Sequence, residues 1–154
     1  MIIKQLNAQD VSELRDTIYN FLEICFISTF EKTDKQLIET KLDGLVKYVK
    51  EGKAYLFGAF CEKQMLGFLW GYPVSSPFET VFHIAYISVS ENGRRQGIGR
   101  NLILAAENQA NTIGINKVEL IVGANNNSAL GFYKKMNYEI DRITLSKYVE
   151  SLTS

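Results

Sequence analysis

Three consecutive runs of β-branched and aromatic residues constrain the fold more than any other part of the chain. They cover residues 54–60, 65–72 and 80–89, and the short polar stretch Cys61-Glu62-Lys63-Gln64 separates the first two. Such runs predict strands, and a connection this short joins antiparallel neighbours. We therefore expect a hairpin that is followed, after the break at Ser75-Ser76-Pro77, by a third long strand.

Two amphipathic helices are predicted before the hairpin. A short strand over residues 2–6 comes first, and Asp10 with Glu13 three residues later has the pattern of a capping box. Apolar residues then recur at helical spacing as far as Phe26, which predicts one long helix. After a polar break the same spacing returns, and Gly52 stands where a helix C-cap belongs.

Strands and helices alternate after residue 89. The sequence predicts a helix from the following glycine loop to about Ile113, a strand over 117–122, a helix over 128–136, and one or two strands in the remainder to about Val149. This order favours a mixed, mostly antiparallel sheet of six or seven strands with about four helices on its faces. The expected class is α/β or α+β, folded as a single domain over 1–154.

Charge balance and cysteine content argue against several classes of function. Lysine plus arginine number 17 and aspartate plus glutamate 17, so no overall field draws the chain to nucleic acid or to an anionic membrane. Two cysteines and one histidine support neither a disulfide framework nor a metal site. The chain begins without a signal-peptide pattern and has no apolar run near the ~18 residues that cross a membrane. We therefore expect a cytoplasmic protein.

The segment from residue 94 to residue 100 carries the strongest chemical signal. It reads Arg94-Arg95-Gln96-Gly97-Ile98-Gly99-Arg100 and lies between a predicted strand and a predicted helix. At such a junction backbone N–H groups and the positive end of the helix converge on an anion, and glycines let the backbone come close to it. The segment predicts a diphosphate-binding loop.

Two other phosphate-binding loops fit this segment less well. A P-loop needs Gly-Lys-Ser/Thr after its second glycine, whereas Ile98-Gly99-Arg100 follows Gly97. A dinucleotide fingerprint needs a third glycine where Leu102 stands, although Glu119 falls at the distance of the ribose-binding acid. A nucleotide-binding domain of dinucleotide type stays open as an alternative.

Two further segments accompany the loop. Ile84-Ala85-Tyr86-Ile87-Ser88-Val89 precedes it, and Asn126-Asn127-Ser128-Ala129-Leu130-Gly131-Phe132-Tyr133 follows it. Together with the loop they resemble the GCN5-related N-acetyltransferase (GNAT) family, whose hallmark is Arg/Gln-x-x-Gly-x-Gly/Ala at the start of the central helix. The family's fourth strand and its Asn-x-x-Ala-x-x-x-Tyr segment match the other two. One departure is Met136-Asn137-Tyr138, where members carry Leu-Gly-Phe; asparagine is the best substitute for glycine in a left-handed turn, so we expect the turn to survive.

The resemblance implies a fold, a cosubstrate and a reaction. It implies a GNAT-like acyl-CoA N-acyltransferase that moves an acetyl group from acetyl-CoA directly to a primary amine of a small molecule or peptide, without a metal, as a monomer or homodimer. Asn126 would steady the coenzyme arm, and the strand and loop would hold the rest through residues Ile87, Ser88, Val89, Arg94, Arg95, Gln96, Gly97, Ile98, Gly99 and Arg100. Acetylation of protein N-termini or lysines, and a non-catalytic acyl-CoA-binding module, remain alternatives.

The resemblance also suggests a proton donor. Tyr133 matches the family's acid. Free thiols have a pKa of ~8.5 and tyrosine one of ~10, so a tyrosine beside the sulfur can protonate a departing thiolate. A packing role on a short helix is the alternative. A backbone N–H near Val89 would stabilise the oxyanion.

The general base is open to more than one assignment. His83 is the only histidine, the residue type that most often serves as a general base, and it lies eleven residues before Arg94, where histone-modifying members of the family place a glutamate base. A water chain or a carboxylate such as Glu79 is the alternative base, and a strand histidine can also be purely structural. No cysteine nucleophile is expected, because neither Cys25 nor Cys61 has a histidine partner at local spacing.

The acceptor amine has no such motif. We expect its site to be built from residues 26–34, 70–76 and 140–144, because loops and strand ends carry specificity on a fixed scaffold.

Overall fold

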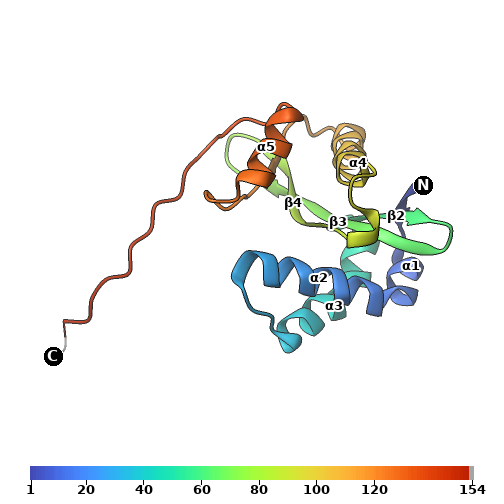
Figure 1. The fold of residues 1–154 in the computed structure, drawn as a ribbon. Coiled ribbons are helices and arrows are strands. Elements are labelled where there is room, and N and C mark those ends of the chain that lie inside the picture. Colours follow the sequence, from blue (N-terminus) through green and yellow to red (C-terminus); the bar gives the residue numbers. More distant parts are fainter. Residues whose placement is uncertain (153–154) are drawn as a thin grey trace. The chain divides into compact units, whose positions relative to one another are not determined.

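The computed structural model describes residues 1–152, and their contacts group into two compact units, 1–121 and 122 onward. The first unit contains a five-stranded sheet with helices α1 to α4, and the second contains helix α5 (Figure 1). The mixed α/β class is confirmed, with five strands in place of the predicted six or seven. The single domain over 1–154 stays a prediction.

The strands follow one another across the sheet in chain order. The first four are antiparallel neighbours, and the fifth is parallel to the fourth; their bounds are β1 (Ile2–Leu6), β2 (Tyr55–Cys61), β3 (Gln64–Ser75), β4 (Thr80–Val89) and β5 (Val118–Leu120). The predicted hairpin is confirmed, and its turn consists of Glu62 and Lys63, with Glu62 in the left-handed region at φ 55°. A parallel β5 needs a crossover connection, which is helix α4.

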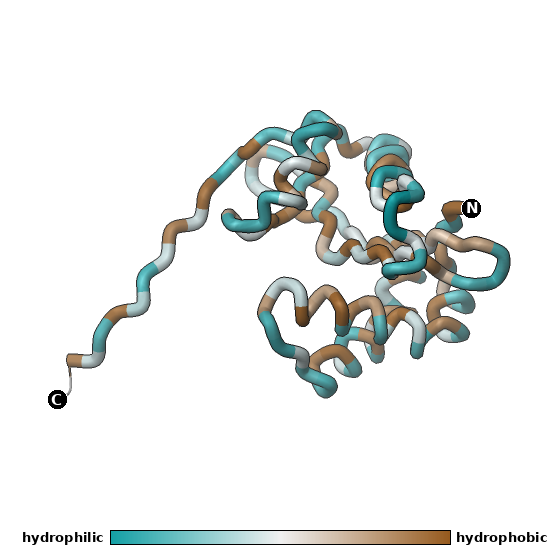
Figure 2. The backbone as a smooth tube through the Cα atoms, viewed as in Figure 1, coloured by the Kyte–Doolittle hydropathy of each residue, from teal (hydrophilic) through white to brown (hydrophobic). Residues whose placement is uncertain are grey.

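Four helices pack on the two faces of this sheet. Helices α1 (Ala8–Glu13), α2 (Arg15–Phe30) and α3 (Lys35–Lys50) lie on one face, and α4 (Ile98–Thr112) lies on the other (Figure 1). Hydrophobic and hydrophilic residues alternate along α2 and α3, as expected of helices with one buried side (Figure 2). The core between these helices and the sheet contains Leu6, Val11, Ile18, Phe21, Leu22, Phe26, Ile38, Leu42, Leu45, Phe68 and Trp70.

The predicted start of the first helix is wrong. Asn7, not Asp10, is the N-cap of α1: its side chain accepts from the Asp10 N–H at 2.8 Å, and the Asp10 carboxylate accepts from the Asn7 N–H at 2.9 Å. Asp10 is the third helical residue of a capping box and not the first of one. The predicted single helix is also divided in two, because the backbone leaves helical geometry at Leu14.

Gly67 of β3 sets the distance between the sheet and α4. A Cβ at this position would lie 2.6 Å from Cγ2 of Ile98 and 3.1 Å from Cδ1 of Leu102, both of which are fully buried. Ile98 is the first residue of α4. The absence of a side chain at Gly67 therefore fixes where α4 begins relative to β3.

We expect Gly67→Ala to lower the free energy of unfolding by about 1–3 kcal/mol, because the added methyl group overpacks a filled interface. Urea denaturation measures the change. Gly131→Ala is the matched control and should not lower the free energy of unfolding. A Cβ at position 131 meets nothing within 4 Å, and alanine has a higher helix propensity than glycine within α5 (Asn127–Lys135). If Gly67→Ala unfolds at the same urea concentration as the parent, close packing at this point does not set the position of α4.

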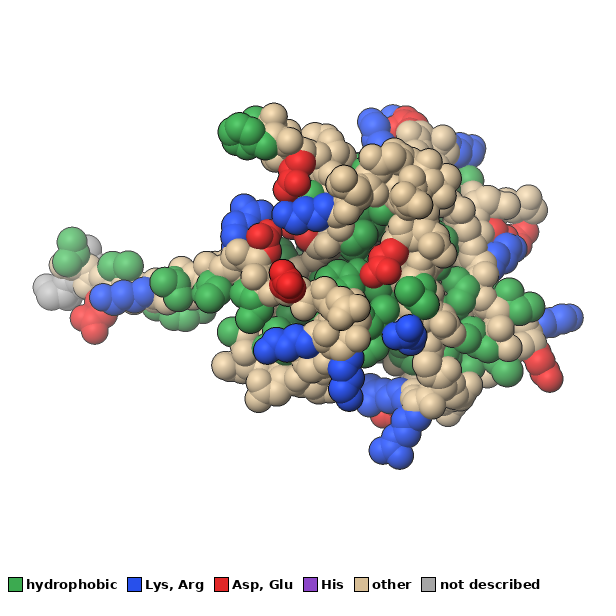
Figure 3. Space-filling model, turned by 90° about the horizontal axis from the view of Figure 1, so that it is seen from above, with side chains coloured by type: hydrophobic (Ala, Val, Ile, Leu, Met, Phe, Trp, Pro, Cys, Tyr) green, Lys and Arg blue, Asp and Glu red, His purple; other side chains and the backbone are tan. Residues whose placement is uncertain are grey.

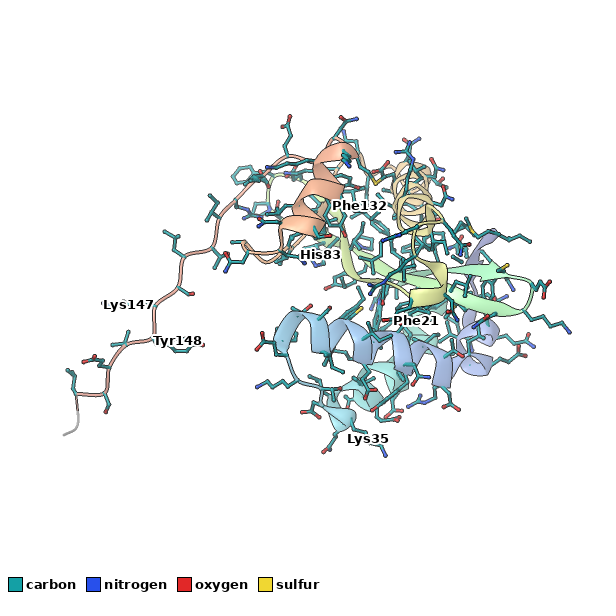
Figure 4. All side chains as sticks on the ribbon, viewed as in Figure 1. Phe21, Lys35, His83, Phe132, Lys147 and Tyr148 are labelled. Atoms are coloured by element: carbon teal, nitrogen blue, oxygen red, sulfur yellow. The ribbon has the colours of Figure 1, made fainter. Side chains whose placement is uncertain are left out.

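The second unit contains α5 (Asn127–Lys135) and the chain that follows it. Asn137 has φ 69°, so the left-handed turn expected at this asparagine is confirmed. The one or two strands predicted to about Val149 are wrong: residues 138–152 contain neither a helix nor a strand. Leu145 and Tyr148 in this segment are exposed, and Tyr148 is labelled in Figure 4. Alternating apolar residues give strand propensity, but a strand forms only where a neighbour supplies the hydrogen bonds.

Candidate active site

The predicted diphosphate loop connects β4 to α4. A 3-10 turn over Glu91–Gly93 follows β4, and the chain is extended at Arg94. It then takes the left-handed conformation twice, at Arg95 (φ 65°) and at Gly97 (φ 73°). Glycine adopts this conformation freely, whereas arginine does so at a cost of order 1 kcal/mol or more. Residues held in this way cluster at binding sites, which agrees with the prediction that Arg95 belongs to the coenzyme loop.

The first turn of α4 presents unpaired backbone donors. Gly97 is the N-cap, and no side chain makes a capping bond there. The first bond of the helical ladder runs from the Asn101 N–H to the Gly97 carbonyl at 3.0 Å. The N–H groups of Ile98, Gly99 and Arg100 precede that bond and lie at the positive end of the helix. This is the backbone arrangement that binds phosphate oxygens.

Two contacts fix the shape of the loop from within. The Gln96 side-chain amide donates to the Asn92 carbonyl at 2.8 Å. Gly93 is buried, and a Cβ there would lie 2.8 Å from Cδ1 of Ile98 and 3.1 Å from the Leu66 carbonyl. Gln96 therefore supports the loop through its side chain, while the arginines at 94, 95 and 100 have exposed side chains.

One edge of β4 is open beside the predicted coenzyme segment. β3 pairs with β4 as far as Val89, whereas β5 pairs with β4 only over Phe82–Ile84. Within residues 1–152, no strand pairs with the β5 side of Ile87–Val89. An open edge offers its N–H and C=O groups to an extended ligand.

A bulge in β4 is a feature that the sequence analysis missed. Trp70 of β3 pairs with Tyr86, and the next residue, Gly71, pairs with Ile84. Ala85 therefore has no partner on β3. Side chains three positions apart in a regular strand point to opposite faces, but the extra residue brings His83 and Tyr86 to the same face. No residue type in the segment marks the bulge, because it depends on the pairing with β3.

His83 lies in a row of three side chains on adjacent strands. It pairs in register with Tyr72 of β3 and with Glu119 of β5. The Tyr72 and His83 rings are 5.5 Å apart, and Oε1 of Glu119 lies 3.6 Å from Nδ1 of His83, an electrostatic contact longer than a hydrogen bond. His83 is labelled in Figure 4. Glu79, the alternative carboxylate base, is instead paired with Lys117 at 3.1 Å.

Cys25 of α2 contacts the coenzyme segment from the α2 face of the sheet. Its side chain is 8% exposed, and its thiol donates to the Ile87 carbonyl at 3.6 Å. Burial raises the pKa of this thiol to about 11, so it stays protonated at neutral pH. A protonated thiol is a poor nucleophile, which supports the expectation that no cysteine takes the acetyl group.

The raised pKa of Cys25 predicts a loss of stability at high pH. The thiol of the unfolded chain ionises at its ordinary pKa near 9, while the native thiol keeps its proton until about pH 11. The unfolded state therefore binds fewer protons in this window, and the free energy of unfolding falls as the pH rises through it. Chemical denaturation between pH 8 and pH 11 measures this slope. It should be shallower in Cys25→Ala and unchanged in the exposed-site control Cys61→Ala; equal slopes in parent and Cys25→Ala would contradict the account.

The second unit contains the other two predicted site residues. Asn126 is the N-cap of α5, and its side-chain oxygen accepts from the Ala129 N–H at 3.1 Å, so the cap is Asn126 itself and neither of the flanking asparagines. This bond uses the amide oxygen and leaves the NH2 group as a donor. Tyr133 packs edge-on against Phe132 at 5.0 Å and Tyr138 at 5.7 Å between ring centroids. Phe132 is labelled on α5 in Figure 4.

The sequence matches the acetyltransferase (GNAT) family over residues 15–138. The chain belongs to this family. The match extends from α2 through the turn after α5. The dinucleotide hypothesis has no support from this assignment.

Individual relatives agree with the GNAT assignment. The chain is 30% identical over 84 residues to the N-terminal acetyltransferase B complex catalytic subunit naa20 of Schizosaccharomyces pombe, a match that covers 54% of this chain and 47% of that protein. The chain spans about half the length of that relative.

Solved structures share the fold. An aminoglycoside acetyltransferase from an uncultured soil metagenomic sample, in complex with sisomicin, superimposes with a TM-score of 0.74 at 21% identity, covering 97% of this chain and 95% of that one. A tetramutant of the BH1408 protein from Bacillus halodurans gives 0.74 at 18% identity, covering 97% and 100%.

Among residues 1–152, no group of three or more histidine, cysteine, aspartate or glutamate side chains could hold a metal ion. None of the described helices combines the length and apolar character of a membrane span.

Proposed function

We propose that this acetyltransferase transfers an acetyl group from acetyl-CoA directly to a primary amine of a small molecule or peptide. The observation that carries the proposal is the uncapped start of α4, where the N–H groups of Ile98, Gly99 and Arg100 have no place in the helical ladder. A diphosphate is the group of acetyl-CoA that such a site fits, because two phosphates accept several N–H bonds and are favoured by the helix dipole. The exposed arginines at 94, 95 and 100 add positive charge.

The open edge of β4 fits the rest of the coenzyme. The pantetheine arm is a chain with two amide groups, and Ile87, Ser88 and Val89 present backbone groups that β5 does not use. Their position just before the diphosphate loop matches the order of these groups along acetyl-CoA. Asn126 is proposed to hold the same arm through its NH2 group.

The reaction needs a base that removes a proton from the amine, a hydrogen-bond donor to the carbonyl oxygen, and an acid that protonates the departing sulfur. Acetyl-CoA supplies a thioester whose carbonyl carbon accepts the amine. We assign removal of the amine proton to His83, stabilisation of the carbonyl oxygen to the backbone N–H near Val89, and protonation of the departing sulfur to Tyr133. A C–N bond forms and the C–S bond breaks, and the products are an amide and free CoA.

The remaining expectations accompany this proposal. We propose a cytoplasmic enzyme that acts as a monomer or homodimer and does not bind nucleic acid. On the face drawn in Figure 3, acidic side chains are interspersed with lysines and arginines, whereas a nucleic-acid site gathers basic ones. The alternative acceptor is a protein or peptide N-terminus or lysine, because the relative naa20 belongs to an N-terminal acetyltransferase complex.

An amine panel tests the proposal. The chain is incubated with acetyl-CoA and aminoglycosides, polyamines, amino acids or N-terminal peptides, and free CoA thiol is detected with a chromogenic disulfide. We expect thiol release with at least one class of amine and a matching acetylated product by mass spectrometry. Binding of acetyl-CoA without thiol release for any class would instead favour a non-catalytic acyl-CoA-binding module.

A further inference from the structure

Tyr72 and Glu119 flank His83 in a row of side chains, and neither has a role in the proposed reaction. These residues are directly opposed in register on β3, β4 and β5, so their side chains share one face of the sheet. The Tyr72 ring packs against the imidazole at 5.5 Å with an interplanar angle of 53°, and the Glu119 carboxylate approaches it from β5. The imidazole is thus held between an aromatic ring and a carboxylate.

The contact with Glu119 distinguishes the two ring nitrogens of His83. Oε1 lies 3.6 Å from Nδ1. A carboxylate beside one nitrogen favours the tautomer with the proton on that nitrogen, because an ionised carboxylate can only accept a hydrogen bond. Nε2 is then unprotonated and able to accept a proton. Contacts of this kind often tighten to hydrogen bonds when a substrate binds.

Partial burial makes this contact stronger than one on the surface. The His83 and Glu119 side chains are 18% and 28% exposed, so the solvent screens their interaction less than it screens an exposed pair. The neighbouring carboxylate, Glu79, is bound to Lys117 at 3.1 Å and has its own partner. Glu119 is the acid that the β4–β5 register assigns to His83.

We propose that Glu119 is a positioning residue that orients His83 and fixes its proton on Nδ1, so that Nε2 is the nitrogen presented to the acceptor amine. This inference rests on the proposed role of His83 as general base. Glu119 acts through His83 and has no contact with the reacting atoms in this account. The short β5 strand then has a function, since its three residues are the ones that bring the carboxylate beside the base.

The tautomer of His83 can be observed directly, because it is the only histidine in the chain. With 15N-labelled histidine, the two ring nitrogens give separate NMR signals whose shifts report which one is protonated. At a pH where the ring is neutral, we expect protonated Nδ1 and unprotonated Nε2 in the parent. In Glu119→Ala the Nδ1–H population should fall from the majority to the minority, since free histidine prefers the other tautomer.

Two variants control this experiment. Glu79→Ala removes the neighbouring carboxylate, which pairs with Lys117, and it should leave the His83 tautomer unchanged. Glu119→Gln keeps an oxygen that can accept from Nδ1 and should retain most of the Nδ1–H population. If Glu119→Ala folds poorly, Glu119→Leu removes the acceptor while keeping the bulk of the side chain, and the same loss of Nδ1–H is expected. An unchanged tautomer in Glu119→Ala, or an equal change in Glu79→Ala, would overturn the inference.

Kinetics provide the second readout and separate this inference from the proposed function. On an accepted amine, Glu119→Ala should lower kcat roughly tenfold, part of the about 100-fold or more that a general base supplies, with KM for acetyl-CoA unchanged. Glu119→Gln should recover part of that loss. The NMR result needs neither substrate nor turnover, so an inactive chain would refute the proposed function while the tautomer still decides the role of Glu119.

Discussion

Replacing Tyr133 by phenylalanine is expected to lower kcat by about 100-fold while the affinity for acetyl-CoA stays that of the parent. The change removes the phenolic O–H and keeps the ring, so the edge-on packing against Phe132 and Tyr138 is retained. Without this proton source, the sulfur leaves as a thiolate, whereas the coenzyme contacts of the loop and of β4 are untouched. Free-thiol release at saturating amine measures kcat, and calorimetry measures binding.

Tyr138→Phe is the matched control for this result. It deletes a phenolic hydroxyl from the ring that packs against Tyr133, without removing the proposed acid. It should keep the parent's kcat. A Tyr133→Phe enzyme with full activity would remove the proton-donor role, and equal losses in both variants would point to packing around α5 in its place.

Gly97→Val is expected to weaken acetyl-CoA binding by about 10- to 100-fold. A valine at φ 73° strains the backbone by roughly 1–2 kcal/mol, and its side chain extends into the open space at the start of α4. The proposed binding mode places the diphosphate of acetyl-CoA in that space. Displacing one charge-assisted N–H to phosphate bond costs about 1.5–3 kcal/mol, which corresponds to the stated loss of affinity.

Gly114→Val separates backbone strain from coenzyme binding. Gly114 follows the other end of α4, has φ 80°, and also has nothing within 4 Å of a Cβ. Both variants should therefore lose similar stability in urea, but only Gly97→Val should bind acetyl-CoA more weakly by calorimetry. Equal affinities in the two variants would show that the loop at Gly97 is not where the coenzyme's phosphates bind.

The features that the sequence predicted well depend on local signals. β4 was expected over 80–89 and has those bounds, and α4 starts at the glycine loop and ends next to Gly114. Asn137 has the left-handed backbone that its replacement of glycine suggested. In each case a run of residues or a single turn residue sets the conformation with little help from distant parts of the chain.

The features that the sequence did not predict depend on contacts between distant segments. The bulge at Ala85 exists only in the register with β3, and the contact of Glu119 with His83 exists only because β5 is parallel to β4. Residues 139–152 have strand-like alternation but form no strand, since alternation alone supplies no pairing partner. At the N-terminus the sequence predicted Asp10 as the cap, whereas the side-chain hydrogen bonds make Asn7 the cap and Asp10 the third helical residue.

Thermal unfolding with and without cofactors tests the central claim, that the loop over 94–100 and the edge of β4 bind acetyl-CoA. The midpoint is measured in the presence of acetyl-CoA, CoA, ATP or NAD at equal concentration. A ligand at 100 times its Kd stabilises the native state by about 2.7 kcal/mol, which raises the midpoint by roughly 5 °C or more. We predict that acetyl-CoA and CoA give this increase and that NAD does not. An increase with NAD and none with acetyl-CoA or CoA would contradict the account.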